Sequence, residues 1–261
     1  RTPSDPSVTV RGNKWFDHSK REGGYAISFV QRYYRLPYPE AVLLLLGRKD
    51  GRALEQAKPA ATEPKSFALP QPYSNMRRVY AYLLHKRHIE REVVSYFTHE
   101  KLLYEDEHHN CVFVGRNESG QAKYAGLRGT YDLDGPGFKG DAPGSDKNTG
   151  FSLPHDPRSD LVLVFEAPID LMSYLTLHRN TPNALALCGL YDGALQAYLA
   201  DHPQIKRIEL CLDADGPGRE AARQFQDKYA ALGYVVTVEE PRSGKDWNEY
   251  LQKRKTPERG R

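Results

Sequence analysis

Ile208-Glu-Leu-Cys-Leu-Asp-Ala-Asp-Gly-Pro-Gly-Arg-Glu-Ala-Ala222 is the stretch that decides the fold, because its character changes from strand to helix across two carboxylates. Apolar side chains occupy every second position from Ile208 to Leu212, which predicts a β-strand. The Gly-Pro-Gly that follows breaks this alternation. In residues 219–229 the apolar side chains recur at helical spacing instead. A strand followed at once by a helix indicates one unit of an α/β sheet.

Two carboxylates, Asp213 and Asp215, come where this strand should end. Residues two apart in an extended segment point to the same side, and the carboxyl ends of parallel strands border the usual ligand site of an open α/β sheet. Because like charges repel unless a cation lies between them, the pair predicts a hard-metal site suited to partly hydrated Mg²⁺ and phosphate chemistry. A solvated turn before a helix N-terminus explains an isolated Asp-x-Asp equally well.

The C-terminal part of the chain repeats the order of strand and helix. Apolar runs at residues 160–166, 184–189 and 234–238 predict three further strands, with helical patterns between them. This alternation predicts a parallel sheet with right-handed crossovers. Glu166 then ends its strand at the same edge as the Asp-x-Asp pair. The polar motif Ser243-Gly-Lys-Asp-Trp-Asn-Glu-Tyr-Leu251 follows the last strand on that side.

The whole chain has an ordinary globular composition, with 261 residues and 39% hydrophobic side chains. We find no signal peptide and no apolar run near the roughly 20 residues that span a bilayer. Three widely spaced cysteines, Cys111, Cys188 and Cys211, lie in or beside apolar runs and predict buried thiols. We therefore expect a cytoplasmic protein without membrane contact. The chain starts at Arg1 without a methionine, so this end is not taken as a natural boundary.

The charge is divided unevenly along the chain. Residues 1–150 hold 23 Lys and Arg against 18 Asp and Glu, and residues 151–261 hold 14 against 16. The first part is basic and the second slightly acidic. This division suits binding of a nucleic acid whose backbone lies on the basic part and whose reacting phosphate reaches the acidic part.

Residues 1–47 form the first predicted domain. It consists of two short strands and two helices, at residues 7–10, 14–16, 25–34 and 39–47. This order resembles the zinc-ribbon domain that precedes the catalytic core in bacterial replicative primases. That family carries a Cys-x-x-Cys pair where this chain has residues 15–24 without cysteine. His18 beside Asp17 cannot make a tetrahedral structural site, so we expect a degenerate ribbon without zinc.

Residues 48–75, rich in Ala, Pro, Glu and Lys with little periodicity, predict a linker. Residues 76–150 then predict an α+β subdomain. Its elements are two helices and a hairpin, at residues 76–84, 90–97, 110–115 and 121–131. The Gly-rich segment 132–150 predicts a surface loop that touches backbone or phosphate.

This subdomain resembles the amino-terminal subdomain of the primase core. It resembles more closely the uncharacterised domain found beside Toprim domains in proteins of bacterial mobile elements. The primase subdomain guides single-stranded template, so the resemblance implies a phosphate-binding role for basic residues along it: Arg116, Lys123, Arg128, Lys139 and Lys147. An ordinary solvated face is the alternative interpretation.

Four motifs in residues 159–252 together resemble the Toprim domain of bacterial primases, topoisomerases and some nucleases. They are Glu166 with Asp170, the Gly-ended strand at 184–189, Asp213-x-Asp215, and Lys245-Asp246-x-Asn248. We therefore expect a Rossmann-like parallel Toprim domain over residues 151–252 and a frayed basic tail over residues 253–261.

The Toprim resemblance implies roles for the acids and the lysine. Glu166 would be the general acid or base near a 3′-oxygen, and Glu166, Asp213 and Asp215 would hold one or two Mg²⁺ or Mn²⁺ ions. Lys245 would pair with a phosphate and Asp246 would complete the acidic cluster, the alternative being a salt-bridged loop.

Asp170 and Asn248 would support this cluster from behind. Asp170 either fixes Glu166 or a metal-bound water, or it only caps its helix. The pattern does not decide between these two roles.

The leading hypothesis is a primase-like Toprim enzyme of a mobile element. It would bind single-stranded DNA and nucleotides, work beside replication or mobile-element proteins, and catalyse Mg²⁺-dependent nucleotidyl transfer. A metal-dependent Toprim nuclease, with water as the nucleophile, is the first alternative. A non-catalytic DNA-binding or partner-binding module is the second, so catalysis itself stays open. A topoisomerase is a minor alternative, because the chain has no room for a strand gate.

Overall fold

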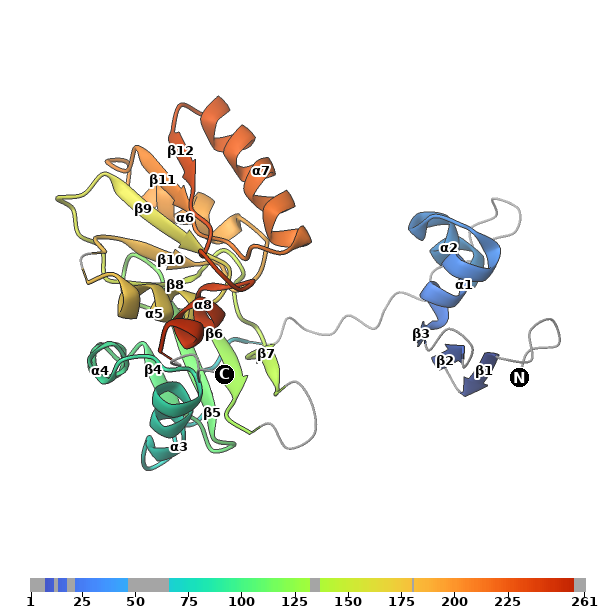
Figure 1. Cartoon of the computed structure of the whole chain (residues 1–261), viewed down its shortest axis with the longest axis horizontal. Coiled ribbons are helices and arrows are strands. Elements are labelled where there is room, and N and C mark those ends of the chain that lie inside the picture. Colours follow the sequence, from blue (N-terminus) through green and yellow to red (C-terminus); the bar gives the residue numbers. More distant parts are fainter. Residues whose placement is uncertain are drawn as a thin grey trace, which may run out of the picture. The chain divides into compact units, whose positions relative to one another are not determined.

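The computed structural model describes residues 8–11, 14–17, 22–46, 66–131, 137–179 and 181–255. Its contacts divide the chain into two compact units, Arg1–Glu63 and Pro64–Arg261 (Figure 1). Of the predicted linker at 48–75, only residues 66–75 are described, and they pack along the second unit. There the Tyr73 N–H donates to Glu105 O at 2.7 Å and the Tyr104 hydroxyl donates to Pro70 O at 2.6 Å.

The first unit is a three-stranded antiparallel sheet followed by two helices. These elements are β1 (Val8–Arg11), β2 (Lys14–Asp17), β3 (Glu22–Tyr25), α1 (Ala26–Tyr34) and α2 (Tyr38–Leu45). Buried Trp15 donates to Ser28 Oγ at 3.1 Å, which ties the sheet to α1. The sequence did not predict strand β3, because a Gly-Gly pair is typical of a turn. His18 lies outside the described residues, and the zinc-ribbon likeness stays a prediction.

The second unit contains the predicted parallel sheet. Its strand order is β12-β11-β9-β10-β8, for β8 (Phe151–Ser152), β9 (Leu161–Phe165), β10 (Ala184–Ala186), β11 (Arg207–Leu210) and β12 (Val235–Val238). Four of these strands are parallel, and β8, which the sequence did not predict, pairs antiparallel with β10. The α/β fold class is confirmed.

Helices cover both faces of this sheet (Figure 1). They are α5 (Pro168–Leu177), α6 (Gly193–Asp201), α7 (Gly216–Ala231) and α8 (Trp247–Lys255). Val162 and Val164 of β9 belong to the core beneath α6 and α7, whereas Leu163 and Phe165 belong to the core that includes α5 and α8. The continuous apolar run that predicted β9 thus reflects burial on both faces.

An α+β subdomain precedes this sheet. Its antiparallel sheet has the order β4-β5-β6-β7, for β4 (Leu103–Glu105), β5 (Asn110–Arg116), β6 (Ala122–Gly129) and β7 (Lys139–Asp141). Its helices are α3 (Arg77–Ala81), the π-helix η1 (Tyr82–Lys86) and α4 (Arg91–His99). The predicted hairpin is confirmed as β5 and β6.

The predicted loop at 132–150 was wrong for Lys139–Asp141, which form β7. Strand propensity does not predict this strand, because Gly140 lies at its centre and glycine is rare in strands. Its missing side chain leaves room for the Phe138 ring, which would lie 3.1 Å from an added Cβ. Residues 132–136 of the segment lie outside the described residues.

Both sheets of the second unit share one apolar core. Phe97 of α4 and Phe113 of β5 pack on Phe151 of β8, with ring centroids 4.9 Å and 5.4 Å apart. The same core continues to Phe165 and Trp247 of the parallel sheet and its helices. The α+β subdomain is therefore held in a fixed position beside the carboxyl edge of the parallel sheet.

Two helix boundaries differ from the predictions. Helix α7 begins at Gly216, not after Gly218, because Asp215 caps it and Pro217 fits the first turn. Helix α8 continues through Lys255, so the first residues of the predicted frayed tail are its last turn, and residues 256–261 lie outside the described part. Within the described residues, no helix has both the length and the apolar character to cross a membrane.

Trp247 provides a test of how α8 is held. Its indole N–H donates to Cys211 O at 2.9 Å, and its side chain is 1% exposed. Trp247→Phe leaves that buried carbonyl without its donor, so we expect chemical denaturation to show a loss of about 1–3 kcal/mol in the free energy of unfolding. Val235→Ala, at a 61% exposed position on β12, should stay within about 0.5 kcal/mol. Equal effects of both substitutions would contradict this role.

Candidate active site

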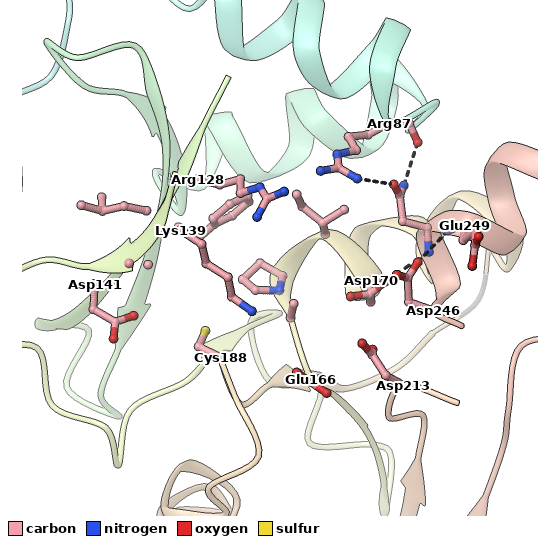
Figure 2. A pocket seen from close by; sticks show the side chains of 18 of the residues that line it. Arg87, Arg128, Lys139, Asp141, Glu166, Asp170, Cys188, Asp213, Asp246 and Glu249 are labelled. Carbon is pink, nitrogen blue, oxygen red and sulfur yellow. Dashed lines mark hydrogen bonds between the residues drawn. The ribbon is translucent and has the colours of Figure 1, made fainter. Parts of the chain in front are cut away.

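A cavity of about 460 Å³ lies between the carboxyl edge of the parallel sheet and strands β6 and β7. Figure 2 shows Arg87, Arg128 and Lys139 across the cavity from Glu166, Asp213 and Asp246, with Asp141 of β7 on the same side as Lys139. The acidic wall is formed by Glu166, Asp170, Asp213 and Asp246, and the basic wall by Arg87, Arg128 and Lys139. The basic wall comes from the α+β subdomain and the acidic wall from the parallel sheet and its helices, and both pack on one core.

The acidic wall follows from chain topology. Glu166 comes directly after β9, Asp213 follows β11, and Asp246 precedes α8. Parallel pairing of β9 with β11 brings the first two to one edge, as the sequence predicted. A hydrogen bond holds Asp246 near this edge, because the N–H of Ala214 donates to the carbonyl of Lys245 at 2.6 Å.

Electrostatics show that this wall is crowded with negative charge. Burial raises the pKa of Asp213 to about 7, and the charges of Glu166 and Asp246 add to the shift. Burial also raises the pKa of Glu166, which Lys139 opposes and Asp215 increases. The Oδ1 atom of Asp213 is buried without a hydrogen-bond partner. An orphaned carboxylate oxygen among other carboxylates is a suitable ligand for a hard cation such as Mg²⁺.

Among the described residues, no group of three or more acidic, His or Cys side chains is already gathered tightly enough to hold a metal ion. The acids share the cavity without forming a finished coordination shell. Mg²⁺ usually keeps several waters and takes only one or two carboxylates, so this looser arrangement suits it. Glu166 and Asp213 would be the residues that hold it.

Asp215 is placed differently from Asp213. Its Oδ1 accepts the Gly218 N–H at 2.9 Å and caps α7, and the residue does not line the cavity. It contributes its charge, which raises the pKa of Asp213. Gly218 is required here, since a Cβ at that position would lie 2.1 Å from Asp213 O. The interpretation of the motif as a polar turn before a helix therefore describes Asp215, and its predicted role as a metal ligand stays a prediction.

Asp246 and Lys245 lie at the start of α8. The Asp246 Oδ1 accepts the Glu249 N–H at 2.7 Å and thus caps that helix. Lys245 Nζ is 4.0 Å from Asp246 Oδ2, and both side chains line the cavity. The lysine is more than half exposed, which leaves its ammonium group able to meet a phosphate.

Asn248 links the acidic wall to the neighbouring subdomain. Its N–H donates to Asp170 Oδ1 at 3.1 Å, and burial raises the pKa of that carboxyl. Its side-chain amide donates to Arg87 O at 2.8 Å and to Ser173 Oγ at 2.9 Å. Its Oδ1 accepts from Arg87 at 3.2 Å and from Gln252 at 2.7 Å. Every hydrogen-bonding position of this side chain is used, which fixes α5, α8 and η1 together.

The predicted phosphate-binding residues separate into two groups. Arg128 and Lys139 line the cavity opposite the acids. Lys147 instead pairs with Asp141 and lies 5.4 Å above the Tyr124 ring. Arg116 donates to Gly120 O at 2.7 Å beside a different cavity, and Lys123 lies on β6 outside the lining of the first.

Arg87 was not singled out from the sequence. It follows η1 directly, and its Nε donates to the Tyr82 hydroxyl at 2.8 Å. Arg128 donates to the same hydroxyl at 3.3 Å, so one tyrosine holds both guanidinium groups at the cavity. The only sequence signal was the basic run Leu84-His-Lys-Arg-His-Ile89, whose spacing does not show which residue faces inward.

Cys188 was predicted only as a buried thiol. It is half-buried, lines the cavity and has a left-handed backbone with φ 61°, whereas Cys111 and Cys211 are buried as predicted. Its place after β10 corresponds to the Gly-ended strand motif, which was the available signal.

The comparisons with known proteins agree with this fold. Residues 163–251 match the Toprim-like family, and residues 81–158 match a family described as a protein of unknown function, DUF3991. The C-terminal part of the chain is therefore a Toprim-like domain. The resemblance predicted from its motifs is confirmed.

Two curated relatives are themselves described as uncharacterised. One, from Bacillus anthracis, is 27% identical over 81% of this chain and 65% of its own length. The other, from Mycoplasma genitalium, is 32% identical over 26% of this chain and 31% of its own length. The chain thus spans less than two thirds of both relatives.

Among solved structures, the RNA polymerase domain of Mycobacterium tuberculosis primase DnaG is similar, with a TM-score of 0.51 and 19% identity. The match covers 68% of this chain and 72% of that one. This likeness is one of fold and covers about two thirds of the chain.

The raised pKa of Asp213 predicts a pH-dependent effect on stability. The folded pKa is about 7, above the ordinary value of 3.8, so ionising this group costs stability as pH rises through that interval. In metal-free buffer, Asp213→Asn should raise the Tm relative to the parent at pH 8, and the difference should vanish near pH 4.

The matched control is Asp227→Asn, an exposed acid on α7. It removes the same charge outside the cavity and should leave the Tm within about one degree of the parent at both pH values. A pH-independent difference for Asp213→Asn would contradict the crowded acidic wall.

Proposed function

We propose that this chain is a primase-like nucleotidyltransferase, which extends a nucleic acid strand with nucleotides on single-stranded DNA using Mg²⁺ or Mn²⁺. The observation that carries the proposal is the single cavity with an acidic wall, including the orphaned Asp213 oxygen, facing a basic wall. The Toprim-like domain and the primase fold support the same reaction class.

Each wall has a distinct task in phosphoryl transfer. When bound by Glu166 and Asp213, a divalent cation supplies charge neutralisation at the phosphate and a lowered pKa for a bound hydroxyl. Burial raises the pKa of Glu166, which is the direction expected for a carboxyl that takes and gives a proton during the reaction.

The basic wall would hold the phosphates of the incoming nucleotide or the template. Arg87 and Arg128 present planar guanidinium groups, which recognise phosphate oxygens in a bidentate way. Lys139 is exposed on β7 and lowers the pKa of Glu166 across the cavity, so its charge acts at the same place. The charge of a phosphate between the walls would be neutralised by the basic wall on one side and by the cation bound to the acidic wall on the other.

The tyrosine that lines the cavity does not suit a topoisomerase nucleophile. The Tyr124 hydroxyl donates to Asp141, and burial raises its pKa, so the phenol stays protonated. A nuclease that uses water as its nucleophile needs the same acids, and the reaction products distinguish it from a primase.

Removing the cavity acids should abolish the reaction. We expect Glu166→Gln and Asp213→Asn each to lower primer synthesis from ribonucleotides on single-stranded DNA by roughly 10³-fold or more, because each removes a group that acts on the reacting phosphate. Asp227→Asn serves as the control and should keep parental activity.

The assay uses labelled single-stranded DNA with Mg²⁺ or Mn²⁺, with and without nucleotides. Products that grow only with nucleotides support the primase. Shortened strands that appear without nucleotides favour the nuclease, and the absence of both products with intact DNA binding favours a binding module. Robust synthesis by Asp213→Asn would overturn the assignment.

The separation of the predicted basic residues gives a further test. Lys139→Ala should weaken single-stranded DNA binding severalfold and reduce the slope of log K against log salt by about 0.7, the value for one lost phosphate contact. Arg116→Ala removes the same charge at a site away from this cavity and should leave the slope unchanged. Equal effects of the two substitutions in a titration by fluorescence anisotropy would contradict the assigned basic wall.

A further inference from the structure

A second surface of the α+β subdomain carries aromatic and basic side chains. Tyr73 and Tyr131 are 41% and 43% exposed. The His109 ring lies between them, with ring centroids 4.5 Å from Tyr73 and 6.4 Å from Tyr131. The Arg78 guanidinium lies 4.5 Å from the centroid of the Tyr131 ring. We call these four side chains the aromatic platform.

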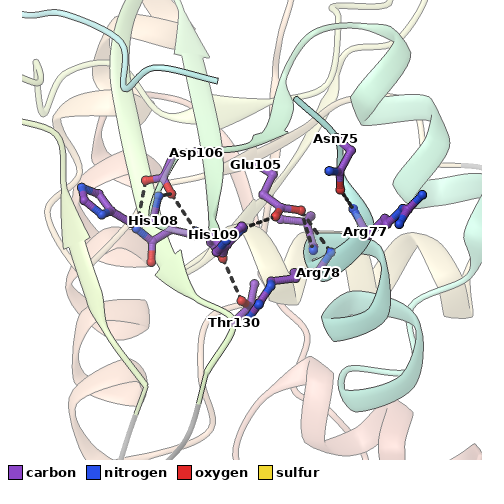
Figure 3. Close-up of polar contacts among 10 residues, drawn as sticks. Asn75, Arg77, Arg78, Glu105, Asp106, His108, His109 and Thr130 are labelled. Atoms are coloured by element: carbon purple, nitrogen blue, oxygen red, sulfur yellow. Dashed lines mark hydrogen bonds and ion pairs between the residues drawn. The ribbon is translucent and has the colours of Figure 1, made fainter. Parts of the chain in front are cut away.

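A buried carboxylate fixes the geometry of the platform. Glu105 is 1% exposed, and its Oε1 lies 2.6 Å from His109 Nδ1 (Figure 3). Its Oε2 accepts the N–H groups of Arg78 and Val79 at 3.1 Å and 3.2 Å. One carboxylate therefore holds both the imidazole ring and the start of the helix that carries Arg78.

The backbone beneath His109 is also constrained. His109 adopts a left-handed conformation with φ 61°, and Thr130 Oγ1 donates to its carbonyl at 2.7 Å. The neighbouring Asp106 accepts the N–H groups of His108 and Asn110 at 2.9 Å and 2.8 Å. A strained residue held by several hydrogen bonds is typical of a functional position.

The platform is connected to the candidate active site by two elements. From Arg78, α3 and η1 lead to Arg87 of the cavity, about 14 Å at the rise of a helix. From Tyr131, the chain leads back three residues to Arg128 of the cavity, about 10 Å at the rise of a strand.

We propose that the aromatic platform stacks the bases of single-stranded DNA whose backbone continues into the candidate active site. Exposed rings beside arginine are the arrangement by which proteins bind single strands without reading sequence. The two exposed cations Arg77 and Arg78 complement a phosphate backbone, and the adjacent turn carries the exposed acid Glu107. This inference rests on the proposed function, since it assumes that the strand continues into the cavity.

The test is DNA binding by the full chain, measured without nucleotides or divalent metal so that catalysis plays no part. Tyr73→Ala and Tyr131→Ala should each raise the Kd for a 12-nucleotide strand roughly tenfold, the effect of losing one stacked base. Tyr73→Phe and Tyr131→Phe keep the ring and should stay within twofold of the parent.

Two controls separate stacking from other causes. Tyr96→Ala removes an equally exposed tyrosine, at 42%, from α4 of the same subdomain and should leave the Kd within twofold. A strand that is abasic throughout should bind the parent and both alanine variants alike.

The proposal is overturned if both alanine variants keep the parental Kd for the 12-nucleotide strand. It is equally overturned if they lose as much affinity for the abasic strand, which would indicate a phosphate contact or misfolding. Failure of primer synthesis would leave these binding results standing, so the platform and the proposed function can fail separately.

Discussion

Repulsion among carboxylates at the edge of the parallel sheet is the interaction on which the rest of the second unit depends. Glu166 and Asp213 are brought together by parallel pairing of their strands, and partial burial raises the pKa of both groups. The surrounding structure offsets this cost. Lys139 and Lys245 lower the pKa of Glu166, while Asp215 and Asp246 accept backbone N–H groups at two helix N-termini. A bound cation would neutralise the negative charge that these contacts leave uncompensated.

The α+β subdomain contributes the opposite wall and the means of holding it. The Tyr82 hydroxyl accepts hydrogen bonds from Arg87 and Arg128. Asn248 bonds to both Arg87 and Asp170 and so joins η1 to helix α5. Because both sheets share one apolar core, the distance between the walls is set by packing rather than by loops. The packing of the two sheets thus explains how a chain with a net charge of only +3 presents an acidic and a basic wall at one cavity.

The sequence predicted the parts of this structure that depend on local pattern. Buried strands such as β9 and β11 have apolar runs that end in acids, so their edge and its carboxylates were predictable. Strands β3 and β7 were not, because Gly-Gly and Lys-Gly-Asp lack strand propensity and are stabilised only by their partners. Nor could periodicity show that Arg87 faces the acids, since that depends on contacts with Asn248, 161 residues away in sequence.

The central claim is that Glu166 and Asp213 together provide a divalent cation site in the cavity. A crystal structure of the full chain soaked in Mn²⁺, with anomalous diffraction to locate the ion, tests it most directly. The account predicts an anomalous peak with oxygen atoms of Glu166 and Asp213 at about 2.0–2.2 Å, completed by waters. A cavity without a peak under saturating Mn²⁺, or a peak bound only by other residues, would contradict it.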